Sequence, residues 1–336
     1  MNCFLPRTVV VLGLVSMLND TASEMITPLL PLFLTTTLGA GPAIVGLVEG
    51  VAEATASILK LVSGWLADRG WNIKKLVVGG YTVSNAARPL IGFALCWGWV
   101  LILRFLDRVG KGIRTAPRDA LIAASTDKHG RGRAFGFQRA LDHTGAMLGP
   151  LLAFGLLQWG MTMEHVFMAS VIPGTALVLL LILGLKAPPA AKPVGPSARV
   201  RWKGLDARVK GLVLASGGLA LATTPEAFLV LWANQGGIIV TWVPLLWAAA
   251  HGVKALVSGP AGALSDHLGR LRVVSIGWTV RVLLLLAFAW LPDAGITVWA
   301  LFLSYAAAMA FTEGAERALI GDFAPPEQKA TVFGIY

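Results

Sequence analysis

The sequence predicts an all-α membrane protein made of two repeated halves of six helices each. Hydrophobic residues make up 56% of the 336 residues and charged residues only 14%, whereas soluble domains contain about 25% charged residues. The hydrophobic residues are gathered in runs long enough to cross a bilayer about 30 Å thick. Short motifs of the first half also recur in the second half at one constant offset, which indicates an internal repeat.

The hydrophobic runs give the expected order of helices along the chain. The predicted spans are 8–36, 43–66, 76–97, 99–124, 135–157, 164–185, 209–233, 238–260, 273–291 and 296–321, and an eleventh begins near residue 328. The first run continues into NDTASEMITPLL without a small-residue cleavage site, so we expect a retained helix rather than a signal peptide. The sequence stops inside the eleventh span, and we therefore expect a piece of a longer, twelve-helix protein.

Basic residues separate the loops into two sets. The net charge of +10 could favour nucleic-acid binding, but the loops after odd-numbered spans contain no Lys or Arg. The loops after even-numbered spans carry Arg69, Lys74, Lys75, Lys128, Arg131, Arg133, Lys186, Lys192, Arg199, Arg201, Lys203, Arg208, Arg270 and Arg272. This is the positive-inside pattern of membrane proteins. It predicts an integral protein of the plasma (inner) membrane with a cytoplasmic N-terminus and no nucleic-acid partner.

The repeat divides the chain at its longest polar segment. The matching segments are GWLAD at 64–68 with GALSD at 262–266, ALI at 120–122 with ALI at 318–320, and FG at 135–136 with FG at 333–334. Between the two sets of motifs lies a segment rich in Pro, Ala and basic residues, which suits a linker. We predict an N-terminal bundle at 1–185, a cytoplasmic linker at 186–208 and an incomplete C-terminal bundle at 209–336.

Two such halves joined by a basic loop resemble the major facilitator superfamily. The family's loop motif, G-x-x-x-D-x-x-G-[RK]-x-[RK], is matched by Gly262, Asp266, Gly269, Arg270 and Arg272, and in an earlier copy by Gly64, Asp68 and Arg69. The fifth span is similar to the family's antiporter signature, G-x8-G-x3-G-P, through Gly136, Gly145, Gly149 and Pro150. The resemblance implies the major facilitator fold, with helices 1, 4, 7 and 10 around a central cavity.

The fourth span carries a stripe of charge that a membrane helix would not expose to lipid. A charged side chain at mid-bilayer costs roughly 2.5–3.5 kcal/mol, so this face must meet water or countercharges. The residues that share the face are Arg104, Asp107, Arg108, Lys111, Thr115 and Arg118.

The candidate substrate and proton cavity combines this stripe with acidic residues of spans 1, 7 and 10. Its members are Asp20, Glu24, Arg104, Asp107, Arg108, Lys111, Glu226 and Glu313. Asp20 and Glu24 either take part in proton or substrate binding or form static pairs with the fourth span. In the same way, Arg104, Arg108 and Lys111 either bind an anionic group of the substrate or neutralise nearby acids.

Candidate gate residues lie nearer the cytoplasmic ends of the spans. In the repeat, Arg118 and Asp119 correspond to Glu316 and Arg317, with the charges exchanged. We expect gate ion pairs in which Lys111, Arg114, Arg118 and Asp119 face Glu313, Glu316 and Arg317. By the resemblance, loop acids hold the outward-facing state, and small residues of span 5 permit rocking. The gate and conformational candidates are Asp68, Arg69, Arg118, Asp119, Gly145, Gly149, Pro150, Asp266, Arg270, Glu316 and Arg317.

Other polar residues within the spans leave alternatives open. Glu49 and Glu53 lie four residues apart in span 2, and they either couple protons or hydrogen-bond between helices. On one face of span 5, Arg139 pairs locally with Asp142, while His143 is a candidate proton relay.

The sequence contains no phosphate-binding loop, metal-ligand spacing or nucleophile–base set. We therefore expect neither an enzyme nor a cofactor or bound metal, and we expect energy to come from an ion gradient. The predicted function is proton-coupled export of a small organic solute by alternating access, carried out by a monomer in the lipid bilayer. The alternatives are proton-coupled uptake of an anionic solute or chelate, and a transport-inactive membrane sensor or scaffold.

Overall fold

The computed structural model describes residues 5–185, 206–222, 243–290, 296–325 and 328–336. These residues are predominantly helical and contain no strand, which confirms the predicted all-α class. The N-terminal helices are α1 (Arg7–Glu24), α2 (Leu30–Leu32), η1 (Phe33–Thr37), α3 (Pro42–Asp68), α4 (Ile73–Leu90), η2 (Ile91–Phe93), α5 (Trp97–Ala124), η3 (Lys128–Gly130), α6 (Arg131–Gln158), α7 (Met163–Ala169) and α8 (Val171–Gly184). The C-terminal helices are α9 (Ala207–Ala222), α11 (Val243–Leu268), α12 (Arg270–Trp290), α13 (Ile296–Phe323) and α14 (Lys329–Ile335).

The first predicted span is broken rather than continuous. Helix α1 ends at Glu24, and after a turn the chain resumes as α2 and the π-helix η1. Pro28 and Pro31 account for the interruption, because proline has no N–H to donate and its ring clashes with the preceding turn. The break falls just after the two acidic residues of α1.

The end of the eighth span was predicted too early. Pro260 lies inside α11, and the helix continues to Leu268, because prolines are tolerated in membrane helices where neighbouring groups satisfy the freed backbone. The end of the predicted seventh span, the start of the eighth, Glu226 and most of the predicted linker lie outside the described residues.

Glycines allow the N-terminal helices to approach one another closely. A Cβ atom added at Gly145 or Gly149 of α6 would meet the backbone of α1. Gly80 of α4 and Gly110 of α5 face each other in the same way. Small residues at such crossings permit the van der Waals packing that holds membrane helices together. The buried Pro150 follows the second α6 contact.

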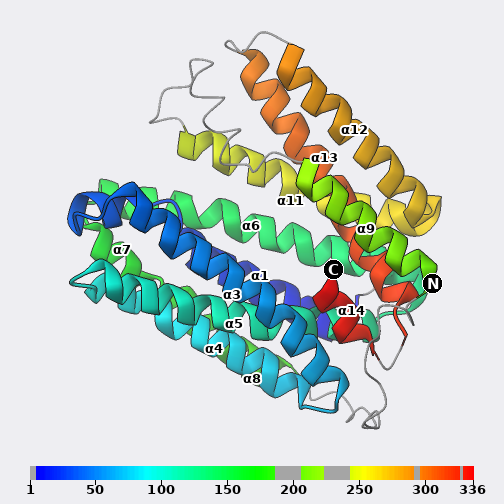
Figure 1. The fold of residues 1–336 in the computed structure, drawn as a ribbon, viewed down its shortest axis with the longest axis horizontal. Coiled ribbons are helices and arrows are strands. Elements are labelled where there is room, and N and C mark those ends of the chain that lie inside the picture. Colours follow the sequence, from blue (N-terminus) through cyan, green and yellow to red (C-terminus); the bar gives the residue numbers. More distant parts are fainter. Residues whose placement is uncertain (1–4, 186–205, 223–242, 291–295, 326–327) are drawn as a thin grey trace.

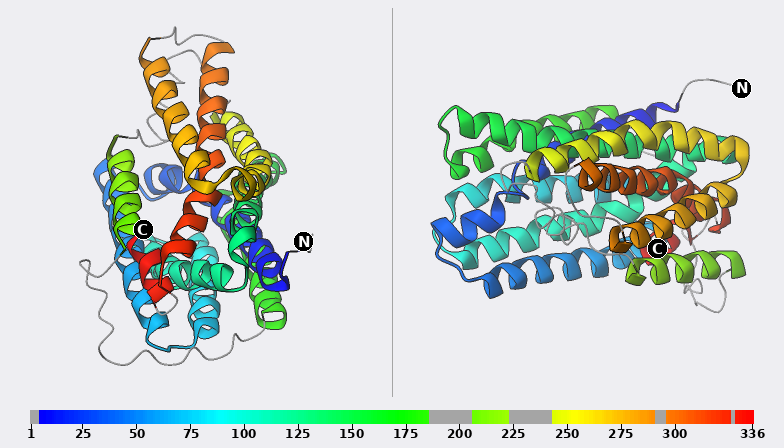
Figure 2. Two further views of the ribbon diagram at one scale, coloured as in Figure 1. Left: turned by 90° about the vertical axis from the view of Figure 1, so that its right-hand side faces the viewer. Right: turned by 90° about the horizontal axis from the view of Figure 1, so that it is seen from above.

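The two sets of helices meet through α6 and α11, which lie side by side (Figure 1). Helix α14 returns to the N-terminal set and packs against α3 and α5. The largest cluster of buried hydrophobic residues draws on α1, α4, α5, α6 and α8 as well as α13 and α14. Figure 2 shows α14, in red, beside the N-terminal helices that it packs against. The two sets therefore share a hydrophobic core where α13 and α14 meet the N-terminal helices.

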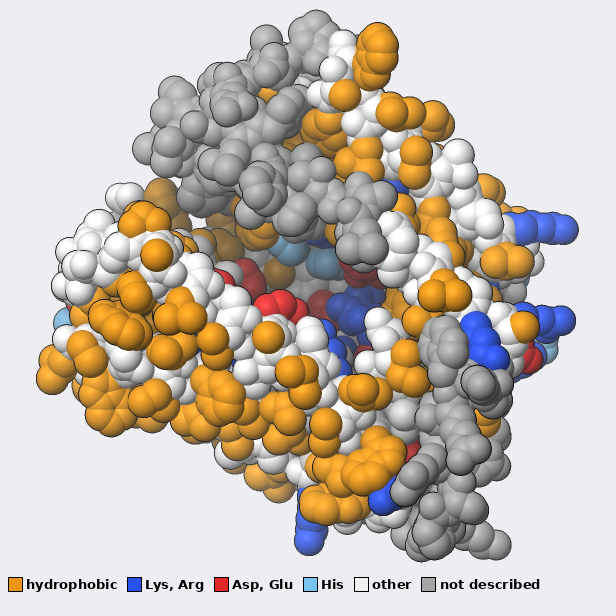
Figure 3. Space-filling view, viewed as in Figure 1, with side chains coloured by type: hydrophobic (Ala, Val, Ile, Leu, Met, Phe, Trp, Pro, Cys, Tyr) orange, Lys and Arg blue, Asp and Glu red, His pale blue; other side chains and the backbone are white. Residues whose placement is uncertain are grey.

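The outer surface is suited to a bilayer. Among the described residues, five helical segments are long and apolar enough to cross a membrane by length and composition: Pro42–Asp68, Lys128–Gln158, Met163–Gly184, Arg270–Trp290 and Ile296–Phe323. Large hydrophobic side chains are exposed along them and cover much of the visible face in Figure 3. Helix α5 is as long as α13, but its many charged residues make it too polar to be counted among these five segments.

Candidate functional site

The charges of α5 converge on Asp107, whose carboxylate is completely buried. Arg88 Nε of α4 lies 2.9 Å from Asp107 Oδ1, an ionic contact without hydrogen-bond geometry. Arg104 Nη1 lies 3.4 Å from Asp107 Oδ2, and Arg108 Nε lies 4.0 Å from the same oxygen. A buried carboxylate requires compensation of this kind, because an unpaired charge in the interior is costly. The three arginines thus share one buried carboxylate inside the N-terminal set.

Arg104 is held a second time by Glu49 of α3. Its Nε and Nη2 atoms donate to the two carboxylate oxygens of Glu49 at 3.1 and 3.2 Å. This two-point contact is the interhelix hydrogen-bonding alternative for Glu49. Because Glu49 and Asp107 hold Arg104 and Arg108, these arginines do not pair with the acids of α1 in this structure.

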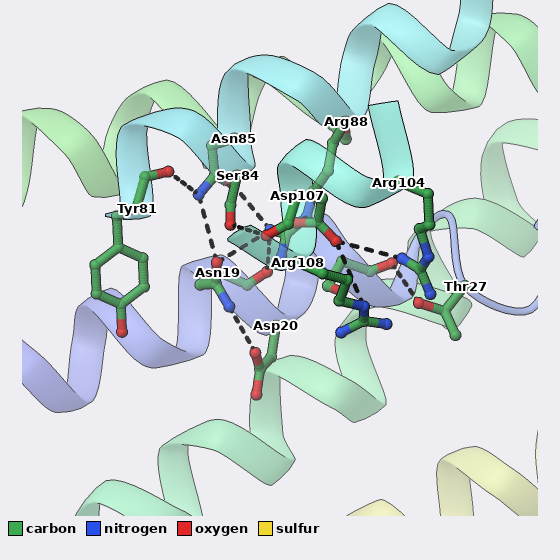
Figure 4. A network of polar contacts seen from close by, with 12 residues as sticks. Asn19, Asp20, Thr27, Tyr81, Ser84, Asn85, Arg88, Arg104, Asp107 and Arg108 are labelled. Carbon is green, nitrogen blue, oxygen red and sulfur yellow. Dashed lines mark hydrogen bonds and ion pairs between the residues drawn. The ribbon is translucent and has the colours of Figure 1, made fainter. Parts of the chain in front are cut away.

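Asn19 joins α1 to the same network (Figure 4). Its side-chain oxygen accepts hydrogen bonds from Arg88 Nη1 at 3.0 Å and Arg114 Nη2 at 3.2 Å. Arg114 also donates to Ser84 Oγ at 2.6 Å and stacks on the ring of Tyr81. Arg114 was expected at the gate, but these contacts place it within the N-terminal set.

Asp20 and Glu24 of α1 are acids that do not pair with the arginines of this network. Asp20 accepts a hydrogen bond from Asn19 Nδ2 at 2.8 Å, and in Figure 4 its carboxylate points away from Arg88, Asp107 and Arg104. Neither acid forms an ion pair with any residue that the structure describes. Both are partly exposed, as is Lys111 of α5, which likewise has no ion pair among the described residues. The alternative in which these acids form static pairs with α5 is therefore not seen among the described residues.

An ion pair between Asp119 of α5 and Arg317 of α13 crosses from one set of helices to the other. Arg118 does not reach Glu316. It lies 3.0 Å from Asp119 and donates to Ser16 Oγ at 3.1 Å. Glu316 instead accepts hydrogen bonds from Trp278 and Tyr336. Of the predicted gate pairs, the structure brings together Asp119 and Arg317 only.

The two loop acids of the repeated motif cap helices of the opposite set. Asp68 accepts hydrogen bonds from the backbone N–H groups of Ala330 and Thr331 at 3.0 and 2.6 Å. Asp266 accepts from Gly132 and Arg133 at 2.9 and 2.8 Å. A carboxylate is stabilising at a helix N-terminus because the first N–H groups have no partner within the helix.

The two caps differ in what surrounds them. Arg270 lies 2.9 Å from Asp266 and pairs also with Asp322, which Arg131 contacts at 2.7 Å. Beside Asp68, Arg69 stacks on the Trp65 ring and forms no ion pair with a described residue. The cap at Asp266 therefore has more charged residues around it than the cap at Asp68. Asp322 and Arg131, which lie beside Asp266, were not among the site residues predicted from the sequence.

Glu313 contacts α6 rather than α5. His143 Nε2 lies 3.0 Å from Glu313 Oε2, while Arg139 lies 3.9 Å from Glu313 and 2.8 Å from Asp142. His143 Nδ1 lies 3.4 Å from His251 Nδ1 of α11. Glu313 was expected to face the cations of α5, so the structure corrects its predicted partners.

A small open pocket adjoins His251. Its remaining lining comprises Trp247, Ala250, Lys254, Phe302, Tyr305 and Ala306. Figure 3 shows acidic, basic and histidine side chains within a hollow between the helices. In the described ranges, no three His, Cys, Asp or Glu side chains gather as a metal site would require.

Comparisons with known proteins agree with this architecture. An uncharacterised MFS-type transporter of Methanocaldococcus jannaschii is 34% identical over 99% of this chain and 84% of its own length. The multidrug resistance protein MdtG of Klebsiella pneumoniae is 27% identical over 80% of this chain and 68% of its own. Among solved structures, the human organic anion transporter MFSD10 superposes with a TM-score of 0.79 at 17% identity, covering 98% of this chain and 88% of that one.

A second solved structure, the Escherichia coli fucose:proton symporter FucP, gives a TM-score of 0.74 at 14% identity, with 97% of this chain and 87% of that one covered. At such identities the likeness shows the fold alone. The sequence itself matches the family model described as Major Facilitator Superfamily over residues 12–336. With helices, repeat and match in agreement, the chain belongs to the Major Facilitator Superfamily and is an integral membrane transporter of that fold.

Proposed function

We propose that this protein exports a small organic solute in exchange for protons, with its N-terminus on the cytoplasmic side. The observation that carries the proposal is the state of Asp20 and Glu24. Both acids lie on the inner helix α1, and neither is paired with a described cation. The neighbouring arginines, by contrast, are held by Asp107 and Glu49.

Two unpaired carboxylates in a membrane interior are suited to reversible proton uptake. Proton binding removes a charge that is costly to bury. If solute and proton compete for the same two carboxylates, each binds when the other leaves, and this competition produces exchange. The charge of Asp20 and Glu24 also favours a solute that carries positive charge when the protons have left.

The contacts between the two sets of helices support alternating access. The Asp119–Arg317 pair and the caps made by Asp68 and Asp266 all join the sets toward the end that carries the chain termini. With a cytoplasmic N-terminus, as the loop charges predict, this arrangement is an outward-facing state. Opening toward the cytoplasm requires all these contacts to break.

The proposed direction of transport is supported by similarity to relatives and to a sequence signature of the family. MdtG of Klebsiella pneumoniae and MdtH of Aeromonas hydrophila are named multidrug resistance proteins. The spacing of Gly136, Gly145, Gly149 and Pro150 on α6 is similar to the family's antiporter signature. Both features favour export over uptake.

The test is proton flux in liposomes that contain the reconstituted protein and a lumenal pH-sensitive dye. Cationic drugs, organic acids and iron chelates are added outside, one class at a time. Exchange predicts that the lumen becomes alkaline as one solute class enters. We expect Asp20→Asn and Glu24→Gln each to abolish the proton signal, whereas Glu164→Gln, at the start of α7 and outside the cluster, leaves it intact.

A folded, inserted protein that carries solute with undiminished proton flux in both variants would contradict the proposal. Loss of flux in Glu164→Gln would show that the assay reports general damage. The substrate class that gives a signal then identifies the solute chemistry.

Lys111 favours a second candidate, uptake of an anionic solute together with protons. It is partly exposed and forms no ion pair with a described residue, so it is the cation of the α5 stripe best placed to meet an anion. Under this candidate an organic acid would make the lumen acidic, and Lys111→Gln would abolish the signal.

A further inference from the structure

Asn19 lies between two buried arginines, Arg88 and Arg114, and Asp20. Its side chain is 4% exposed. Its oxygen Oδ1 accepts from Arg88 at 3.0 Å, from Arg114 at 3.2 Å and from Asn85 Nδ2 at 3.4 Å. Its backbone carbonyl accepts a further hydrogen bond from Arg88 at 3.1 Å. This residue therefore joins α1 to α4 and α5 (Figure 4).

The chemistry of the partners fixes the orientation of this amide. Guanidinium groups donate hydrogen bonds and cannot accept them, so the amide oxygen must face Arg88 and Arg114. The amide NH₂ group is then directed to the other side, where Nδ2 donates to Asp20 Oδ1 at 2.8 Å. A flipped amide would set NH₂ against two cations and its oxygen against a carboxylate.

In this arrangement, Arg88 and Arg114 are linked to Asp20 through the Asn19 amide rather than by direct ion pairs. Arg88 is engaged by Asp107, and Arg114 by Ser84 and the Tyr81 ring. Neither arginine makes an ion pair with Asp20 among the described contacts, so Asn19 stands between them and the carboxylate. A donated hydrogen bond stabilises the ionised form of a carboxyl group over the protonated form. The amide is moreover polarised by the two cations that its oxygen binds.

From this geometry we infer that Asn19 is a positioning residue that sets the proton affinity of Asp20 and links it to the Arg88–Asp107 pair. The consequence for transport rests on the proton role proposed above for Asp20. The effect of Asn19 on the protonation of Asp20 can be measured without a transport assay. In this arrangement, any movement of α4 or α5 that withdraws Arg88 or Arg114 from Asn19 makes Asp20 easier to protonate.

Other charged groups also act on Asp20, and they are unchanged in variants of Asn19. They come from each of the charged elements near α1: Glu24 on α1 itself, Asp142 on α6, and Lys111 and Arg114 on α5. From α4, Arg88 contacts Asn19 rather than Asp20, and α8 carries no ionisable side chain. A difference between variants therefore reports the loss of the Asn19 contact.

The experiment is an infrared difference titration of the protein in liposomes, which follows the carbonyl stretch of protonated carboxyl groups. Asp20→Asn, made in each background, identifies the band of Asp20. Asn19→Leu removes the donor, and Asn19→Ser keeps a small acceptor oxygen while removing the amide NH₂ group; neither variant adds a charge. Asn85→Ala is the matched control, because Asn85 touches Asn19 and Arg88 but forms no hydrogen bond or ion pair with Asp20.

We expect both Asn19 variants to raise the midpoint pH of the Asp20 band by about one unit, the size of one hydrogen bond to a charged group. This is about a tenfold gain in proton affinity. Asn85→Ala should leave the midpoint within a few tenths of a unit of the wild type. Equal midpoints in wild type and both Asn19 variants would overturn the inference, as would a shift in Asn85→Ala as large as that in Asn19→Leu.

The transport assay separates this inference from the proposed function. If Asp20→Asn keeps full proton flux while the infrared shift appears in Asn19→Ser, Asp20 is not the coupling site, yet Asn19 still positions it. If flux is lost in Asp20→Asn but the midpoint does not move, the coupling role stands and the inference about Asn19 is wrong. A protein in which no band disappears with Asp20→Asn contradicts both.

Discussion

Asp119 of α5 and Arg317 of α13 form an ion pair between residues that are 198 positions apart, the offset of the internal repeat. Equivalent residues of two repeats meet where the approximate symmetry axis passes between them. Identical charges would repel there, so contact requires that the charges be exchanged. The exchange that is visible in the sequence thus has a structural reason.

We predict that reversing either charge of this pair loosens the end of the molecule where it lies. Removing one partner of a buried pair costs about 3–5 kcal/mol, so Asp119→Arg and Arg317→Asp should each destabilise the closed arrangement. The double swap should recover only part of the loss, because Arg118 also pairs with Asp119 and would then face an arginine. Ala123 is buried against Gly321 beside the pair, so Ala123→Cys, with Cys3 and Cys96 replaced by Ser, can report opening by its maleimide labelling rate. Equal rates in all variants would contradict the prediction.

The two helix caps should contribute unequally. Asp68 and Asp266 occupy equivalent places in the repeat, but Asp266 also contacts Arg270. Asp68→Ala removes a cap, at a cost of about 0.5–2 kcal/mol. Asp266→Ala also leaves Arg270 with one carboxylate fewer, so it should accelerate labelling of the same reporter cysteine by a further several-fold. Similar rates in the two variants would show that Arg270 adds nothing.

Asp107 should be the acid on which the stability of the N-terminal set depends most. Asp107→Asn leaves Arg88 without its carboxylate and weakens the neutralisation of Arg104 and Arg108, so we expect a loss of about 3 kcal/mol or more. Glu49→Gln is the control, because the Glu49 side chain is 43% exposed and Arg104 keeps Asp107. Thermal unfolding in detergent should rank Asp107→Asn well below Glu49→Gln, and the reverse order would contradict the network as described.

The crossing of α1 and α6 should not tolerate a methyl group at Gly145. Its Cβ would collide with the backbone of Met17, and forced overpacking costs about 1–3 kcal/mol. Gly155 of the same helix has open space at the equivalent atom, so Gly155→Ala should be neutral or slightly stabilising. Melting temperatures of the two variants test this, and equal losses would show that the close contact with Met17 is not the cause.

Much of the fold could be predicted from local features. The helical spans follow from hydrophobic runs, and the repeat from short matching motifs such as those at Asp68 and Asp266. Pro28 and Pro31 explain the interruption after Glu24. The end of α11 at Leu268 could not be predicted in this way, because a proline such as Pro260 usually indicates the end of a helix. Asn19 lay beside Asp20 in the sequence, but nothing there distinguishes it from an ordinary polar residue of a membrane helix.

The sequence by itself therefore determined the class of the protein, its repeat and the set of charged residues buried in its helices, because hydropathy and helical period act over a few neighbouring residues. Only the tertiary structure decided which charges neutralise each other. Arg88 meets Asp107, Arg104 meets Glu49, and Asp20 receives an amide instead of a cation. Electrostatic pairing depends on distances between helices that are far apart in the chain, and those distances exist only once the helices are packed.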